Sequence, residues 1–132
     1  MINRTIPTEI TELKDNEIFV FGSNTSGKHS RGAAKRSLTW GAIWGQGEGL
    51  QGKTYGIPTK NSKIRTLPIS DIKPFVERFI QFAKEHPTMI FLVTEIGCGL
   101  AGYKPKDIAP LFKGVETLEN VKLSERFWHK LK

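Results

Sequence analysis

Two short apolar segments, residues 18–21 (IFVF) and residues 89–93 (MIFLV), each run directly into a glycine-rich loop. Nine of the 13 glycines lie between Gly22 and Gly56, and three more lie within residues 96–102 (IGCGLAG). Glycine weakens helices and strands, so glycines clustered beyond predicted strand ends indicate loops whose backbone approaches something closely. Because ligands of open α/β sheets bind beyond the carboxyl ends of the strands, these loops are predicted to form two walls of one nucleotide-sized cleft. Tight turns without a ligand are the alternative for each loop.

The clearest predicted helix lies between Ser70 and Pro87. Ser70 suits a helix N-cap, and Asp71 suits the first turn that follows it. The apolar residues then recur at helical spacing on one face, namely at Ile72, Phe75, Val76, Phe79, Ile80 and Ala83. Shorter helices are expected over residues 32–40, 106–112 and 124–131.

The remaining predicted strands are short. A strand over residues 54–57 is expected to end at Pro58, and another is expected over residues 120–123. Residues 41–52 are too rich in glycine for either regular element. The alternation of strands and helices predicts a single α/β domain over residues 1–132, with a mostly parallel mixed sheet flanked by helices.

The charge of the chain favours anionic partners. The 20 basic residues exceed the 13 acidic ones, which gives a formal net charge of +7. Basic residues gather in and beside both glycine-rich windows, where they are either a solvated face or the rim of an anion site: Lys28, His29, Arg31, Lys35, Arg36, Lys60, Lys63, Arg65, Lys104 and Lys106.

No stretch approaches the roughly 18 apolar residues that a membrane span requires, so no membrane contact is expected. Residues 1–9 lack the apolar run of a signal peptide. The lone cysteine, Cys98, excludes an intramolecular disulfide, so a cytoplasmic, reducing location is expected. The scattered histidines His29, His86 and His129 predict no metal site, and no cofactor is expected.

Three segments, in this order, resemble ligand-binding segments of the macrodomain family, α/β modules that bind ADP-ribose. They are Gly22-Ser23-Asn24 with Arg31-Gly32-Ala33-Ala34, then Ile57-Pro58-Thr59-Lys60, then residues 96–102. The Pro-Thr-Lys strand end is similar to one branch only, which comprises the terminal ADP-ribose glycohydrolase type and the antitoxin that removes ADP-ribose from DNA bases. The resemblance implies a three-layer macrodomain-like fold that binds ADP-ribose, ADP-ribosylated protein or ADP-ribosylated nucleic acid.

Backbone N–H groups that converge from glycine-rich turns can hold a diphosphate without lysines. The backbone at Gly27, like that at Gly32 and in the second loop, is expected to come within hydrogen-bond distance of the diphosphate. Asn24 is expected either to bond the ligand or to cap a turn. Phe21 and Tyr103 are candidates for stacking on a ring, although Phe21 also suits the core. The ligand-binding residues carried over from the resemblance are Phe21, Gly22, Ser23, Asn24, Arg31, Gly32, Ala33, Thr59, Ile96, Gly97, Cys98, Gly99, Leu100, Ala101, Gly102 and Tyr103.

Catalysis is implied only in part. In the branch marked by Lys60, a lysine attacks the anomeric carbon of the distal ribose, and an aspartate in or just after the second loop helps to resolve the adduct. Here Leu100 is followed by Ala101, and Asp107 is the nearest aspartate. Cys98 is a weaker candidate nucleophile because no histidine partner is evident. Two functions therefore stay open: an ADP-ribose or NAD-derived nucleotide binder, with or without hydrolysis through Lys60, and a basic nucleic-acid-binding module without catalysis.

Overall fold

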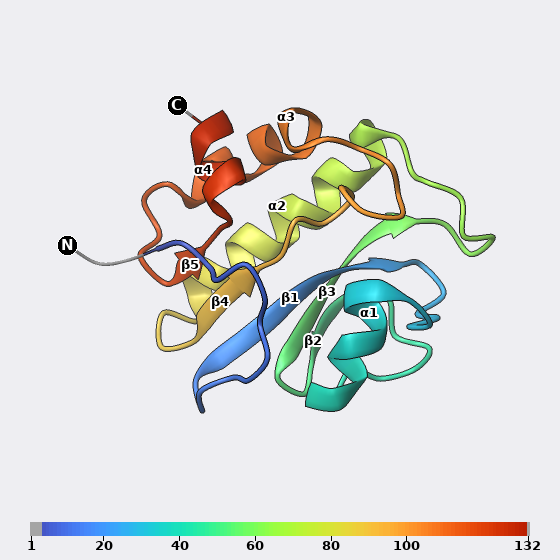
Figure 1. The fold of residues 1–132 in the computed structure, drawn as a ribbon, viewed down its shortest axis with the longest axis horizontal. Coiled ribbons are helices and arrows are strands. Elements are labelled where there is room, and N and C mark those ends of the chain that lie inside the picture. Colours follow the sequence, from blue (N-terminus) through green and yellow to red (C-terminus); the bar gives the residue numbers. More distant parts are fainter. Residues whose placement is uncertain (1–3, 132) are drawn as a thin grey trace.

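A five-stranded sheet with the order β2-β3-β1-β4-β5 organises residues 4–131, the part of the chain that the computed structural model describes (Figure 1). The central strand β1 pairs in parallel with β3 and β4, and β4 pairs in parallel with β5. Only β2 runs antiparallel to its neighbour. The predicted α/β class and the mostly parallel mixed sheet are confirmed. The strands are β1 (Glu17–Asn24), β2 (Gly49–Gln51), β3 (Thr54–Lys60), β4 (Ile90–Val93) and β5 (Val121–Lys122).

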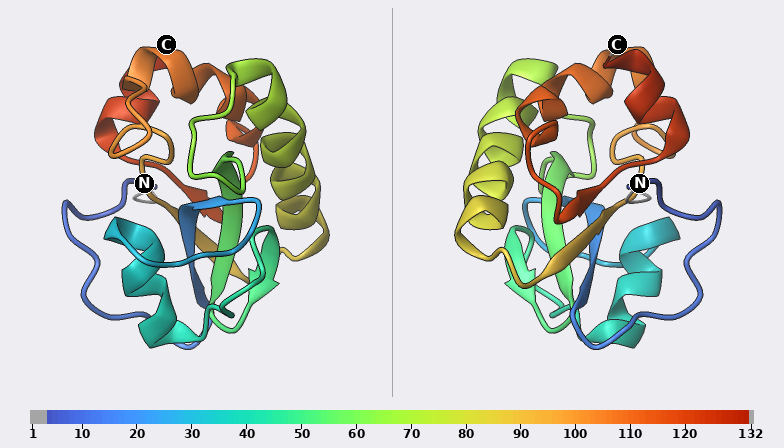
Figure 2. Two further views of the ribbon diagram at one scale, coloured as in Figure 1. Left: turned by 90° about the vertical axis from the view of Figure 1, so that its right-hand side faces the viewer. Right: turned by 90° about the vertical axis from the view of Figure 1, so that its left-hand side faces the viewer.

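Helices cover both faces of the sheet, and β1 shows why. Successive side chains of a strand point to opposite faces. Ile18 and Val20 lie in one hydrophobic cluster and Phe19 and Phe21 in the other, and all four are buried. Figure 2 shows these two sides of the sheet. The first cluster packs under α2 (Ile69–Glu85), α3 (Pro105–Ile108), the 3-10 helix η2 (Ala109–Val115) and α4 (Glu125–Lys130), and the second under α1 (Gly32–Ser37).

The predicted amphipathic helix is confirmed as α2, but its start is corrected. Pro68, not Ser70, is the N-cap, because the Pro68 carbonyl accepts hydrogen bonds from the N–H groups of Asp71 and Ile72 at 2.9 and 3.2 Å. Ser70 therefore lies inside the first turn. The predicted helix over residues 32–40 consists of α1 followed by a short 3-10 helix, η1 (Leu38–Trp40).

Two strand predictions are wrong. Residues 49–51 form β2 despite their glycines, because a two-residue turn beginning at Gly52, whose φ is +61°, pairs Gln51 with Thr54 in a hairpin. The strand β3 also continues through Pro58 to Lys60. Pairing with β2 ends at Gly56, so Pro58 has a neighbouring strand on one side only and its missing N–H is tolerated there.

Most glycines of the first window serve packing between chain segments rather than the predicted cleft. A Cβ atom at Gly47 would lie 2.2 Å from the Asn24 carbonyl oxygen, and one at Gly27 would lie 2.3 Å from the Gln46 nitrogen. Backbone cannot move away cheaply from such contacts, so these positions hold segment 41–52 against the end of β1. The expectation that Gly27 approaches a diphosphate is therefore corrected.

Within residues 4–131, no helix combines the length and the apolar character needed to cross a bilayer.

Candidate functional site

The crevice between β1 and β4 lies where the chain reverses its direction across the sheet. After β1 the chain passes through α1 toward β3, whereas after β4 it passes through α3 toward β5, on the other side of the sheet. The loops that follow β1 and β4 therefore diverge, and they open a crevice at the carboxyl ends of these strands. Glycine-rich segments fill both loops.

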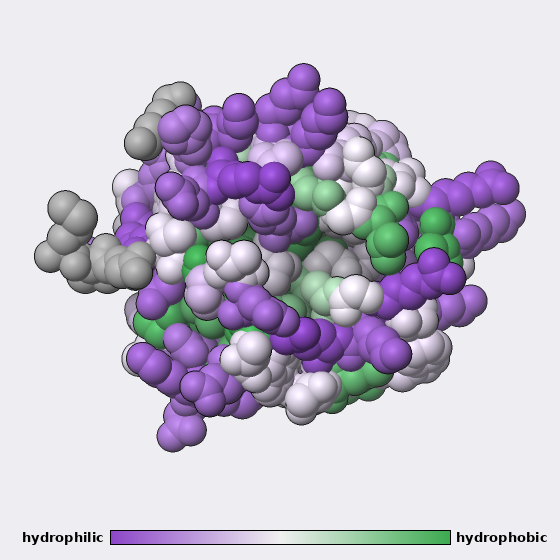
Figure 3. All heavy atoms as spheres, viewed as in Figure 1, coloured by the Kyte–Doolittle hydropathy of each residue, from purple (hydrophilic) through white to green (hydrophobic). Residues whose placement is uncertain are grey.

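A cleft of about 690 Å³ occupies this crevice, a volume within the range of small-molecule sites. The face shown in Figure 3 carries hydrophilic side chains around its rim and more neutral or apolar ones toward its middle. The cleft is lined by Gly22, Ser23, Asn24, Lys28, Ser30, Arg31, Gly32, Ala33, Ala34, Thr59, Lys60, Ile64, Thr94, Glu95, Ile96, Gly97, Gly99, Leu100 and Ala101. The cleft thus brings together Lys60 and twelve of the sixteen residues predicted to bind a ligand.

The loop after β4 presents free backbone donors to this cleft. The loop closes on itself through hydrogen bonds from Gly102 N to Gly99 O at 3.0 Å and from Tyr103 N to Gly97 O at 2.8 Å. Within residues 4–131, the N–H groups of the three successive residues Gly99, Leu100 and Ala101 have no acceptor. Successive free N–H groups in a tight turn form a concave binding site for an anion.

The two glycine-rich loops lie directly against each other at the base of the cleft. A Cβ atom at Gly22 would lie 3.5 Å from the backbone nitrogen of Gly97. Gly97 itself has a φ of +74°, and its Cβ would lie 3.1 Å from the Ile108 side chain, so this glycine is required by the fold. In contrast, a Cβ at Gly99 would meet no protein atom within 4 Å. Gly99 thus lines the cleft and has open space around its Cβ position.

Lys60 lines the cleft from the end of β3. Its backbone is held by a hydrogen bond from Thr25 N to Lys60 O at 2.9 Å and by a bridge to Thr66. Its ammonium group has no hydrogen-bond or ion-pair partner within residues 4–131. Together with Lys28 and Arg31, it makes the lining of the cleft cationic.

Two exposed aliphatic side chains line the cleft. Leu100 was predicted to contact a ligand, whereas Ile64 was not. Ile64 is 44% exposed and Leu100 is 65% exposed. Ile64 has a φ of +60°, which is rare for a β-branched residue, and the Asn61 side chain holds its loop by accepting from two N–H groups. Thr66 Oγ1 donates to Ala101 O at 2.8 Å and joins this loop to the second glycine-rich loop. These side chains offer the cleft an apolar surface.

Glu95 is the one acidic residue among the described residues that line the cleft. Its carboxylate accepts hydrogen bonds from Ser124 Oγ at 2.7 Å and Arg126 Nε at 3.0 Å, and it forms an ion pair with Arg126. The hydrogen bonds from the Arg126 guanidinium hold the pKa of the Glu95 carboxyl below its usual value, so this group stays ionised at neutral pH. Glu95 was not among the residues predicted from the sequence, although its place between β4 and the second loop was a usable signal.

The structure places the predicted carboxylate elsewhere. Asp107 lies in α3 and does not line the cleft, because its Oδ2 accepts from Lys104 N at 2.9 Å at the start of that helix. The four remaining predicted contacts are Phe21, Cys98, Gly102 and Tyr103, and their side chains or backbone also lie outside the lining. Phe21 is fully buried against Phe19.

Tyr103 is also corrected as a stacking residue. It packs against the larger core cluster, and its hydroxyl donates to Leu67 O at 2.7 Å. Asn24 lines the cleft, but its amide makes three hydrogen bonds within its own loop, with Ser26 and Lys28. The turn-capping role of Asn24 is therefore present, and one amide N–H is left for a ligand.

Cys98 is expected to react slowly with alkylating reagents. Burial raises the pKa of its thiol to about 11, and the Glu95 carboxylate adds to this effect. At pH 8 the thiolate fraction is then roughly two orders of magnitude below that of a free cysteine. We expect the iodoacetamide rate to rise tenfold per pH unit between about pH 7.5 and 9.5, and to approach that of a free thiol in denaturant. A rate that levels off below pH 9 would contradict this environment and restore Cys98 as a nucleophile.

No protein-family model, no curated protein and no solved structure matches this chain.

Proposed function

We propose that the cleft binds ADP-ribose or a related NAD-derived nucleotide. The observation that carries this proposal is the turn at Gly99, Leu100 and Ala101: its three N–H groups are free, and its residues line a cleft that cationic residues also line. A diphosphate needs several convergent donors and gains further from nearby positive charge. Lys28 and Arg31, which also line the cleft, supply that charge.

The rest of the cleft suits the other parts of such a nucleotide. Ile64 and Leu100 provide apolar surface for a planar base, and the free amide N–H of Asn24 provides a donor for a base or a ribose. The helices on both faces of the sheet also agree with the three-layer arrangement that the macrodomain resemblance implies. Fold, cleft and resemblance support the same class of ligand.

We further propose that the cleft hydrolyses ADP-ribosyl linkages. In this proposal the amine of Lys60 attacks the anomeric carbon of the distal ribose while the bond to the carrier breaks. The carrier leaves with the bonding electrons and takes up the proton that the lysine nitrogen loses on forming its new bond. Water then displaces the lysine nitrogen and releases ADP-ribose. Glu95 replaces the expected aspartate: as a carboxylate in the cleft wall, it stabilises the positive charge that develops on the ribose.

Isothermal titration calorimetry of the whole chain with ADP-ribose tests the binding proposal. We expect a dissociation constant on the order of micromolar for ADP-ribose and binding at least tenfold weaker for AMP, because AMP lacks the second phosphate and the distal ribose. Equal affinity for both ligands would locate recognition in the adenosine and its first phosphate, the part that AMP shares with ADP-ribose. No heat at millimolar ADP-ribose would overturn the proposal.

A further inference from the structure

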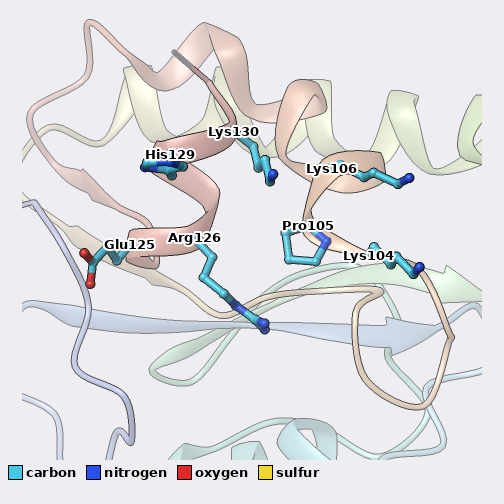
Figure 4. A pocket seen from close by; sticks show the side chains of 7 residues that line it. All are labelled: Lys104, Pro105, Lys106, Glu125, Arg126, His129 and Lys130. Carbon is cyan, nitrogen blue, oxygen red and sulfur yellow. The ribbon is translucent and has the colours of Figure 1, made fainter.

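A second hollow, of about 520 Å³, lies between α3 and α4 and outside the cleft (Figure 4). It is referred to here as the α3/α4 groove. Four of the seven residues that line it are lysine or arginine, and a fifth is His129. The seven are Lys104, Pro105, Lys106, Glu125, Arg126, His129 and Lys130.

The positive charge of the α3/α4 groove is largely uncompensated. Lys104, Lys106 and Lys130 form no salt bridge within residues 4–131. The groove has one acidic residue, Glu125, and Figure 4 shows its carboxylate on the far side of α4 from Lys130. Like charges on the two neighbouring helices repel one another, so an anion that binds between these helices lowers their electrostatic free energy.

The groove and the cleft share a wall. Arg126 extends from α4 into the groove beside Pro105, and its guanidinium pairs with Glu95, which lines the cleft. Lys104 lies two residues after Gly102, the last residue of the second glycine-rich loop. The ion pair between Arg126 and Glu95 thus joins a residue of the groove to a residue of the cleft lining.

We propose that the α3/α4 groove binds the phosphodiester backbone of a nucleic acid. Its cations are spread over two helices rather than converging on one point, which suits a chain of successive phosphates better than a single bound anion. Lysine ammonium groups on flexible stems are typical of phosphate contacts that do not read sequence. Pro105 adds an apolar side chain to the lining of the groove, against which a sugar can rest. This inference goes beyond the proposed function and does not depend on it.

Fluorescence anisotropy with a fluorescein-labelled oligodeoxythymidylate of about 12 nucleotides tests the inference. The test variant is Lys106→Glu with Lys130→Glu. The matched control is Lys14→Glu with Lys84→Glu, which changes the net charge equally at two exposed lysines that precede β1 and β4, at the opposite end of the strands from the cleft. All titrations are repeated between about 50 and 300 mM salt.

We expect the test variant to bind the oligonucleotide at least tenfold more weakly, and the control to stay within about threefold of the unmodified chain. The slope of log K against log salt should fall by about 1.4 in the test variant, because each lost phosphate contact on a single strand removes about 0.7. An equal loss of oligonucleotide affinity in both variants would overturn the proposal, because it would show only an effect of the net charge. Displacement of the oligonucleotide by polyglutamate as readily as by unlabelled oligonucleotide would also overturn it, in favour of an acidic polypeptide.

Calorimetry with ADP-ribose on the same two variants separates this inference from the proposed function. Neither variant changes a residue that lines the cleft, so both should bind ADP-ribose like the unmodified chain. Retained ADP-ribose binding also shows that the test variant is folded. If the unmodified chain binds the oligonucleotide but not ADP-ribose, the proposed function of the cleft is wrong, whereas the inference that the α3/α4 groove binds nucleic acid is retained.

Discussion

Replacement of Gly99 by valine is expected to abolish ADP-ribose binding while leaving the free energy of unfolding nearly unchanged. The new side chain meets no protein atom within 4 Å of its Cβ, and Gly99 does not have the positive φ that disfavours other residues. Its branched side chain instead fills the space beside the free N–H groups where the diphosphate is proposed to lie. We expect affinity to fall at least 100-fold, on the order of 3 kcal/mol, and stability to change by less than about 0.5 kcal/mol.

Two further glycines make this experiment specific. Gly114→Val introduces the same side chain in η2, outside the cleft, and should leave ADP-ribose binding unchanged. Gly97→Val should destabilise the fold, because Gly97 has a φ of +74° and lies 3.1 Å from Ile108 at its Cβ position. Calorimetry gives the affinities, and thermal unfolding gives the stabilities. Undiminished ADP-ribose affinity in Gly99→Val would place the diphosphate elsewhere.

Replacement of Lys60 by methionine is expected to lower the rate of ADP-ribosyl hydrolysis by about 10³-fold or more. Methionine keeps the length of the side chain but removes the amine that attacks the ribose. ADP-ribose affinity should change by less than about fivefold, since the diphosphate is proposed to be held by backbone N–H groups on another loop. The measurement is release of ADP-ribose from ADP-ribosylated DNA and from ADP-ribosylated protein, followed by chromatography. Hydrolysis at an undiminished rate in Lys60→Met would exclude the lysine as nucleophile.

A pair of carboxylate variants tests which acid assists Lys60. Glu95→Gln keeps the shape of the side chain but removes its charge, and should lower hydrolysis by about 10²-fold. Asp107→Asn should have little effect on hydrolysis, because Asp107 bonds the start of α3 outside the cleft. The reverse result would show that Asp107 reaches the substrate in the bound state. If neither variant affects hydrolysis, no carboxylate is required.

The ion pair between Glu95 and Arg126 also predicts how the stability of the fold depends on pH. The pKa of Glu95 is lowered in the folded chain, so its ionised form contributes stability above the ordinary carboxyl range. That contribution is lost as the pH falls through the lowered value, and Arg126→Gln should shift the loss toward higher pH. Because Glu95 is partly exposed and Arg126 is exposed, the effect on stability should be small.

Local sequence patterns were sufficient for the two strands that lead into the cleft and for the longest helix. The apolar runs predicted the cores of β1 and β4, and the helical spacing after Ser70 predicted the buried face of α2. These predictions succeed because periodicity and the avoidance of glycine in regular elements are local properties, which act over a few neighbouring residues. The resemblance, rather than these patterns, suggested the position of Lys60 at a strand end, and Lys60 does line the cleft.

Long-range packing determined the features that these patterns missed. Gly27 and Gly47 look like cleft glycines in the sequence, but the approach of segment 41–52 to β1 explains them. Asp107 and Glu95 are separated in the chain by twelve positions, and only the closure of α3 and α4 over the sheet puts one outside the cleft and the other in its wall. Which side chains face a common space depends on how distant segments meet. That contact is set by the packing of the whole core, not by the residues on either side in the chain.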